Sequence, residues 1–238
     1  MQYALIEIAV HLAVIGLLAG VAALAPGVRL RPGWLALALV LMLLRDAMVL
    51  RGYGLVPDLL PGSDWNWTGK LLATAVLLGV AALPWFGLRR CGATLRQAPG
   101  SAPAWIAFAV LAVAIFALAF HYRDGPDGLD TILFQWTMPG LEEELFYRGV
   151  LLLALDEALD AGDRRRFAGI GIGGVLATIA FGLGHALFYR AGGLSFDAMA
   201  FAMTAVPALL LVWFRVRTGS LLLPVLAHNV ANGAFTVL

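Results

Sequence analysis

The architecture of this protein follows from residues 131–157, which read TILFQWTMPGLEEELFYRGVLLLALDE. The stretch exceeds the roughly 20 apolar residues that cross the hydrocarbon core of a bilayer, yet its centre carries three adjacent glutamates at 142–144. An ionisable group within a span costs roughly 2.5–3.5 kcal/mol, so it faces the protein interior and serves a function there. The stretch therefore predicts a membrane-spanning helix inside a bundle, kinked or broken at Pro139-Gly140.

The whole chain shares this apolar character. Of its 238 residues, 61% are hydrophobic and 13% are charged, and the mean hydropathy is +0.88. Soluble domains carry about a quarter charged residues, so the composition excludes a soluble globular enzyme, a disordered chain and a nucleic-acid binder. A single cysteine, Cys91, excludes an internal disulfide framework and a cysteine-based zinc cluster. The formal net charge of +1 indicates no particular partner.

Eight apolar segments of spanning length are separated by polar and Pro/Gly-rich breaks. They predict an all-α, polytopic integral membrane bundle of about eight transmembrane helices, a single domain over residues 1–238 with short loops. The segments lie near residues 3–25, 33–50, 69–88, 104–120, 131–157, 167–189, 197–215 and 219–237. Arg45 and Asp46 fall inside the second segment, where we expect them to snorkel or to pair near a span end.

Arginine is concentrated in alternate loops between these segments. Because positive residues favour the cytoplasmic side of a membrane, the arrangement predicts a multi-pass protein with both termini outside. Ten residues follow the pattern, namely Arg29, Arg31, Arg89, Arg90, Arg96, Arg164, Arg165, Arg166, Arg215 and Arg217. The intervening loops hold Arg51, Lys70, Arg123 and Arg190.

Helical spacing separates the roles of the three glutamates. Glu144 and Arg148 are one turn apart on one face, which predicts an i, i+4 ion pair that neutralises both charges in an apolar site. Glu143 points about 100° away around the helix and is free for a different partner. A purely structural set of ion pairs that fixes helix packing explains the three glutamates less well, because three acids with one base exceed what helix packing requires.

Two further polar groups lie in later spans. Residues 181–185 read FGLGH, and their glycines let helices approach closely, which predicts a sixth helix packed inside the bundle. His228 and Asn232 form an i, i+4 pair in the last span, where hydrogen-bonded links between helices are the structural alternative. Glu7 and His11 form a similar pair in the first span, for which a water-facing or interfacial position is the simpler interpretation.

A carboxylate, two imidazoles and an amide form a set that is suited to hydrolysis. A glutamate in a dry cavity can act as general base on water with help from a histidine. Histidine and asparagine donors can stabilise the oxyanion of an attacked carbonyl group. The same atoms suit a zinc ion held by Glu143, His185 and His228. The spacing leaves metal-dependent and metal-free chemistry open.

Together these motifs resemble those of the CAAX-protease and bacteriocin-processing (CPBP or Abi) family of intramembrane proteases, and the chain resembles a bacterial-type member of it. The resemblance covers a motif-bearing core of about residues 131–238. The family pattern of Glu-Glu-x-x-x-Arg, Phe-x-x-x-His and His-x-x-x-Asn reads here as Glu143, Glu144, Arg148, Phe181, His185, His228 and Asn232.

The resemblance implies a helical intramembrane endopeptidase. It assigns activation of the attacking water to Glu143 and His185 and binding of the oxyanion to His228 and Asn232. The Glu144–Arg148 pair would support them. The resemblance favours a glutamate-dependent mechanism without a cofactor, zinc being the alternative.

Because Glu142 adjoins the motif, it is a second candidate for the base. The compact length and short loops are similar to bacterial members, which implies a multi-pass protein of the bacterial inner membrane. The implied partners are the lipid bilayer and a membrane-anchored or lipid-modified protein or peptide that is cut near its C-terminus; no nucleic acid is expected. His185 falls nearer the outer face in the predicted topology, which favours an exported substrate, as in myxosortase-like members.

Two functions of other classes stand beside this one. Buried Glu and His side chains also suit a proton-coupled transporter, and a non-catalytic bacteriocin-immunity or scaffold protein can retain the motif. The amide of Asn232 beside His228 favours the enzyme, because a donor pair suits an oxyanion whereas a proton relay needs titratable links along a path.

Overall fold

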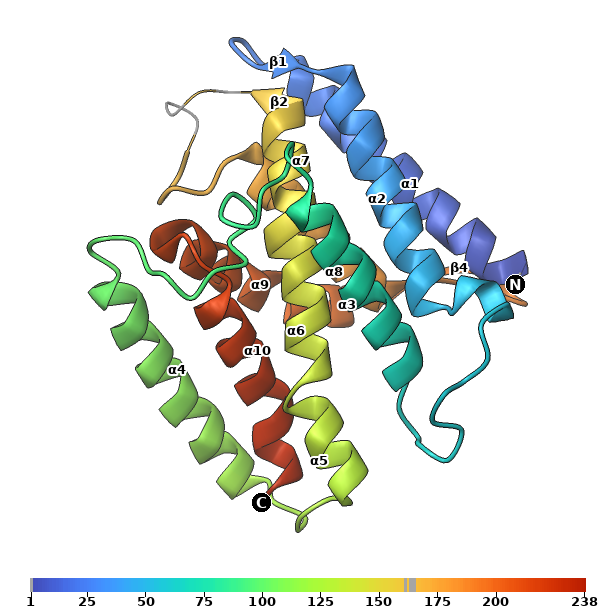
Figure 1. The fold of residues 1–238 in the computed structure, drawn as a ribbon, viewed down its shortest axis with the longest axis vertical. Coiled ribbons are helices and arrows are strands. Elements are labelled where there is room, and N and C mark those ends of the chain that lie inside the picture. Colours follow the sequence, from blue (N-terminus) through green and yellow to red (C-terminus); the bar gives the residue numbers. More distant parts are fainter. Residues whose placement is uncertain (1, 161, 163–165) are drawn as a thin grey trace.

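The computed structural model describes residues 2–160, 162 and 166–238, which form a bundle of helices (Figure 1). The predicted all-α membrane bundle is confirmed as the fold class. Its helices are α1 (Gln2–Ala23), α2 (Pro32–Val49), α3 (Trp67–Ala82), α4 (Ala102–His121), α5 (Leu129–Gln135), α6 (Met138–Glu144), α7 (Leu152–Ala158), α8 (Ile172–Ala186), α9 (Ala198–Thr218) and α10 (Leu222–Gly233). A π-helical segment, Leu145–Leu151, joins α6 to α7, and 3-10 turns occur at Gly52–Gly54 and Ala234–Thr236.

Two short antiparallel strand pairs interrupt the helical pattern. β1 (Arg29–Leu30) pairs with β2 (Leu159–Asp160), and β3 (Leu187–Arg190) pairs with β4 (Gly193–Phe196). The sixth predicted span therefore ends too late, because the chain leaves α8 at Ala186 and turns back as a hairpin. The aromatic residues of β3 favour a strand, and Gly193, the first residue of β4 after the turn, has a φ of +106°, which a residue with a side chain rarely adopts.

Four of the described helices, α1, α2, α4 and α9, are long and apolar enough to cross a membrane. The apolar helices α3 and α8 are shorter. α3 ends at Ala82 rather than at the predicted residue 88, because Leu83 precedes Pro84 and adopts an extended conformation.

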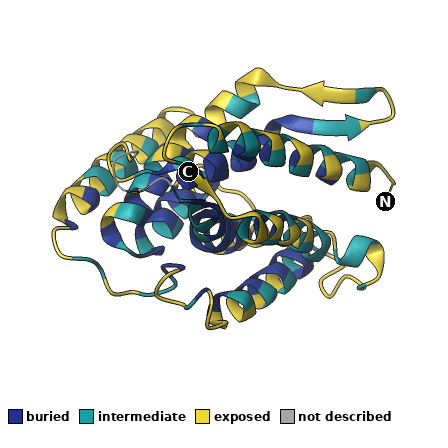
Figure 2. Cartoon of the chain, turned by 90° about the horizontal axis from the view of Figure 1, so that it is seen from above, coloured by how far each residue is buried: buried dark blue, intermediate teal, exposed yellow. Residues whose placement is uncertain are grey.

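The outer surface of the bundle is apolar, as a lipid-facing surface must be. In α4 only Ala104 and Ala119 are buried, while Ile106, Val110 and Val113 are each more than 60% exposed. Figure 2 shows the buried residues gathered at the centre and the exposed ones on the outer faces of the helices. An exposed apolar surface of this kind marks a membrane contact in a chain of this composition.

α8 lies inside the bundle, which confirms the prediction from its glycines. A Cβ atom at Gly173 would lie 2.5 Å from the backbone nitrogen of Asp156 in α7, and one at Gly182 would lie 2.8 Å from the ring of Phe201 in α9. Both neighbouring helices therefore approach α8 at positions where a side chain would not fit.

The arginine-bearing loops meet at one end of the bundle. Arg31 pairs with Glu157 at 2.7 Å and with Asp160 at 3.0 Å, and Arg90 pairs with the same Glu157 at 2.5 Å. The loops after α3 and α9 are joined there by backbone hydrogen bonds, and the termini lie away from this end (Figure 1). The predicted grouping of these loops is confirmed for the part of the chain that is described; Arg164 and Arg165 lie outside it. The membrane side that they face stays a prediction.

Glu7 and His11 bind the hairpin. The Tyr189 backbone N–H donates to Oε2 of Glu7 at 3.0 Å, and Nε2 of His11 lies 3.1 Å from the Leu187 carbonyl oxygen. These two side chains of α1 satisfy the outer edge of β3, as a third strand would. Of the two positions expected for His11, water-facing or interfacial, the water-facing one is excluded because the side chain is buried.

Replacing Glu7 with alanine should loosen the hairpin from α1. The Tyr189 N–H would lose its charged acceptor, so we expect a loss of about 1–3 kcal/mol in the free energy of unfolding. Unfolding in detergent micelles measures it, with Glu7→Gln, which keeps an acceptor oxygen, as the milder control. Equal stability of the alanine variant and the wild type would contradict the proposed contact.

Candidate active site

The three glutamates lie at the end of α6, just beyond a break in the fifth predicted span. α5 ends at Gln135, and α6 begins at Met138 with Pro139 in its first turn, where the missing N–H of proline is tolerated. The predicted interruption is confirmed as a break between two helices. All residues from 142 to 152 are buried, including the π-helical segment, a feature that is frequent at functional sites.

Glu142 is completely buried, and cations hold both of its oxygens. Arg45 of α2 donates Nε to Oε1 at 2.8 Å and Nη2 to Oε2 at 2.9 Å. Lys70 of α3 donates Nζ to the same Oε2 at 2.7 Å. A carboxylate bound in this way is a poor base, because neither oxygen is free to accept a proton.

Glu143 keeps one oxygen free. The Lys70 ammonium donates to Oε1 of Glu143 at 2.5 Å. Oε2 is buried, has no hydrogen-bond partner among the described residues, and lies 3.8 Å from Nε2 of His228. Glu143 is 9% exposed, whereas Glu142 and Glu144 are 0% exposed. Oε2 of Glu144 also lacks a hydrogen-bond partner among the described residues, but Glu143 is the only one of the three carboxylates with any exposed surface.

Glu144 links α6 to α10. Its Oε1 accepts from Nη1 of Arg148 at 2.8 Å and lies 2.7 Å from Nδ1 of His228. The predicted i, i+4 ion pair is confirmed. Because the ion-paired carboxylate accepts, the proton of the second contact belongs to Nδ1. Nε2 of a neutral His228 is then an acceptor that faces Glu143, and it becomes a donor when the ring is protonated.

Phe181 of α8 fills the space between the motif residues. Its ring centroid lies 4.5 Å from that of His185 and 5.9 Å, edge to face, from that of His228. The guanidinium carbon of Arg148 lies 4.4 Å from the same centroid. This cation–π contact stabilises a buried side chain whose Nε and Nη2 have no hydrogen-bond partner among the described residues.

His185 stands at the end of α8, on the exposed side of Phe181. Its Nδ1 lies 2.8 Å from the Phe181 carbonyl oxygen, so Nδ1 donates and Nε2 is left free. His185 interacts electrostatically with Glu143, as Lys70 and His228 also do. The described residues show no hydrogen bond between His185 and Glu143.

The two asparagines of α10, the motif residue Asn232 and Asn229 outside the motif, differ in their contacts. Asn232 is half-buried one turn after His228, and its amide has no hydrogen-bond partner in the described part of the chain. Asn229 instead accepts a hydrogen bond at 3.0 Å from the backbone N–H of Gly140, one of the unpaired donors in the first turn of α6. A Cβ atom at Gly140 would collide with the Asn229 amide and lie 2.8 Å from the Val225 carbonyl oxygen. This contact holds the acid-bearing helix against the helix that carries His228.

Sequence reasoning missed three contributors, Arg45, Lys70 and Asn229. Arg45 does pair near the end of α2, which was one of the two expected alternatives, but its partner is a fully buried acid on a distant helix. Lys70 is a buried residue of the first turn of α3 rather than a loop residue. A basic residue within or beside an apolar span was the available signal for both cations.

The loop between α2 and α3 ties the start of α3 to α5. Asp130 accepts hydrogen bonds from the Ser63 hydroxyl at 2.6 Å and from the Trp67 indole at 2.9 Å, and these bonds lower the pKa of its carboxyl group. The ring of Trp65 stacks on Phe134 at a centroid distance of 4.9 Å. The helix that carries Lys70 is thereby fixed relative to the segment that leads to the acids.

Cys91 is not a candidate nucleophile. Burial raises the pKa of its thiol to about 11, although the charges of Arg215 and Arg90 oppose this shift. The thiol therefore stays protonated at neutral pH, and the thiolate is the reactive form.

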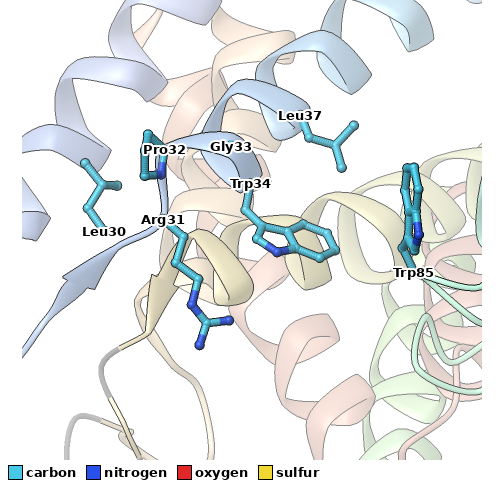
Figure 3. A pocket seen from close by; sticks show the side chains of 7 residues that line it. All are labelled: Leu30, Arg31, Pro32, Gly33, Trp34, Leu37 and Trp85. Atoms are coloured by element: carbon cyan, nitrogen blue, oxygen red, sulfur yellow. The ribbon is translucent and has the colours of Figure 1, made fainter.

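A pocket of about 540 Å³ opens at the first turn of α2 (Figure 3). Its lining residues are Leu30, Arg31, Pro32, Gly33, Trp34, Leu37 and Trp85. It contains none of the motif residues, and Arg45 lies farther along the same helix. The pocket is therefore separate from the candidate site.

The arrangement does not fit the zinc site that the sequence left open. The described residues contain no group of three His, Cys, Asp or Glu side chains placed to hold a metal ion. Of the three expected ligands, Glu143 has Oε1 bound to Lys70 and His228 has Nδ1 bound to Glu144, which leaves only Oε2 and Nε2 of this pair for a metal ion. An ammonium 2.5 Å from the carboxylate supplies the positive charge at the place where a metal would otherwise supply it.

The comparison with known families agrees with this geometry. Residues 125–234 match the family model described as type II CAAX prenyl endopeptidase, Rce1-like. Through this segment the chain is similar to the CAAX-protease family. The match covers just under half of the chain and includes every motif residue, and it supports intramembrane protease activity in general. No curated protein and no solved structure matches the chain.

Placing alanine at Gly140 should separate α6 from α10. The new methyl group would overlap the Asn229 amide, so we expect the free energy of unfolding in detergent to fall by about 1–3 kcal/mol. Gly79→Ala is the matched control, because a Cβ atom there meets nothing within 4 Å. A Gly140→Ala variant as stable as Gly79→Ala would contradict the close approach of the two helices.

Proposed function

We propose that this chain is an intramembrane endopeptidase that hydrolyses a peptide bond near the C-terminus of a membrane-associated or lipid-modified protein. The family match supports the reaction class. The observation that carries the proposal is the free Oε2 of Glu143, buried and 3.8 Å from Nε2 of His228. A water molecule that reaches this oxygen meets a carboxylate and an imidazole at once.

In the proposed reaction, Oε2 of Glu143 takes a proton from a water molecule as the water oxygen attacks the substrate carbonyl carbon. His185, with its free Nε2, assists from the exposed side of the site. Glu143 then returns the proton to the leaving nitrogen as the carbon–nitrogen bond breaks. The products are a carboxylate and an amine.

The oxyanion of the tetrahedral intermediate needs hydrogen-bond donors. We assign this role to His228 and Asn232, one turn apart on α10. His228 donates from Nε2 when its ring is protonated, and the carboxylates of Glu143 and Glu144 lie on its two sides. The Asn232 amide is uncommitted to other partners among the described residues and is free to turn towards the substrate.

The position of the site also bears on the substrate and on the membrane face from which it enters. The site lies in the part of the bundle away from the basic loops, which supports access from the outer face of a bacterial inner membrane and an exported, membrane-anchored substrate. A proton-coupled transporter is less well supported, because each of the three carboxylates is bound to an arginine or a lysine rather than left to titrate along a path.

Glu143→Gln should abolish cleavage while preserving the fold. The amide keeps the shape of the side chain but cannot accept the water proton, so we expect a loss of at least about 100-fold in turnover. Cleavage of a fluorogenic prenylated peptide by the chain in proteoliposomes measures it. Asp124→Asn, the same chemical change in an exposed loop, is the control. Substantial turnover by the Glu143 variant would count against the proposed base. A non-catalytic scaffold would instead show no turnover in the wild type.

Exhaustive chelation should leave cleavage unchanged if the reaction uses no metal. The test is turnover of the same peptide after incubation with EDTA and 1,10-phenanthroline, compared with a mock-treated sample. Loss of turnover followed by recovery on addition of zinc would overturn the metal-free mechanism.

A further inference from the structure

Lys70 is the only lysine in the 238-residue chain; the other fifteen basic side chains of the Lys and Arg class are arginines. It lies before the segment that the family model matches. It is 9% exposed, and its ammonium lies between two carboxylates, 2.7 Å from Oε2 of Glu142 and 2.5 Å from Oε1 of Glu143. A lysine that is singular in the sequence and buried in the site requires an explanation.

The start of α3 is built to bring this side chain to the acids. Asn66 caps the helix by accepting from the Gly69 N–H at 3.0 Å, and its amide nitrogen donates to the Val49 carbonyl oxygen of α2 at 2.8 Å. A Cβ atom at Gly69 would collide with that same carbonyl oxygen. The first turn of α3 therefore packs closely against the last turn of α2, which places Lys70 near Arg45.

Arg45 and Lys70 bind the acids in different ways. Arg45 forms two parallel bonds to Glu142, the geometry that a planar guanidinium favours. Lys70 acts as a compact charge with several donors, which suits a bridge between two carboxylates. The bridge holds Oε1 of Glu143 and thereby fixes the rotation of the carboxylate about its terminal bond. Oε2 is then the oxygen that faces His228.

We propose that Lys70 is a positioning residue for the base: it binds one oxygen of Glu143 so that the other faces the imidazole and the attacking water. The inference rests on the proposed function and adds to it a residue from outside the family motif. Lys70 touches neither water nor substrate in this role; it acts through Glu143.

The alternative is that Lys70 only balances charge. Arg45, Lys70 and Arg148 match the three acids of α6, so removing the lysine alone leaves a buried acid without its cation and endangers the fold. The double variant Glu142→Gln with Lys70→Gln removes one charge of each sign and keeps the cluster neutral. It takes the ammonium from Glu143 but leaves Arg45 and Arg148 in place.

The test measures kcat and KM for the fluorogenic prenylated peptide in proteoliposomes. We expect the double variant to fold as the wild type does but to lose about 100-fold in kcat, with KM changed by less than about 3-fold, because the base is misplaced while substrate contacts remain. Lys70→Arg, which keeps the charge and the donors, should stay within about 10-fold of the wild-type kcat.

Two results would overturn the role of Lys70: near wild-type kcat in the folded double variant, or failure of the double variant to fold while Lys70→Arg folds, which would make the lysine structural. Neither result bears on the base itself. Turnover that persists in Glu143→Gln would instead overturn the proposed function, so the two failures are distinguishable.

Discussion

The burial of three adjacent carboxylates is the constraint on which this structure depends. An unpaired carboxylate in a low-dielectric interior costs several kcal/mol even after the surroundings relax. An apolar bundle can keep the acids at 142–144 ionised only by enclosing matching cations, and the described helices supply Arg45, Lys70 and Arg148. Ion pairs thereby connect a single turn of α6 to α2, α3 and the π-helical segment. The packing of helices around the site is therefore determined by charge neutralisation as well as by apolar contacts.

The same constraint makes the two halves of the chain interdependent. The segment that matches the family model contains all three acids but only one of the three cations, Arg148. The other two, Arg45 and Lys70, come from helices that precede the segment. Without α2 and α3, the interior of the matched segment would carry two uncompensated negative charges. The N-terminal helices are therefore part of the site, although their sequence shows no motif that would identify them as such.

Local features of the site could be predicted from sequence, and long-range ones could not. The Glu144–Arg148 pair follows from helical spacing, and the break before α6 follows from Pro139; both depend on a few neighbouring residues. The pairing of Arg45 with Glu142 depends on how helices far apart in the sequence pack, which spacing does not reveal. The β3–β4 hairpin was missed for a related reason, since an apolar aromatic stretch after a helix fits a longer helix or a strand equally well until its partner is known.

The three acids illustrate how one helical turn can hold chemically different carboxylates. Glu142 has both oxygens bound by cations and is inert as a base. Glu144 is fully buried and directs its bound oxygen to Nδ1 of His228, which fixes the orientation of that ring. Glu143, like Glu144, is bound through Oε1 only, but it is the most exposed of the three. Groups of the same chemical type take different roles when their surroundings differ. Here the difference comes from which cation lies against which oxygen, so the placement of Arg45 and Lys70 selects the reactive acid as directly as the motif itself does.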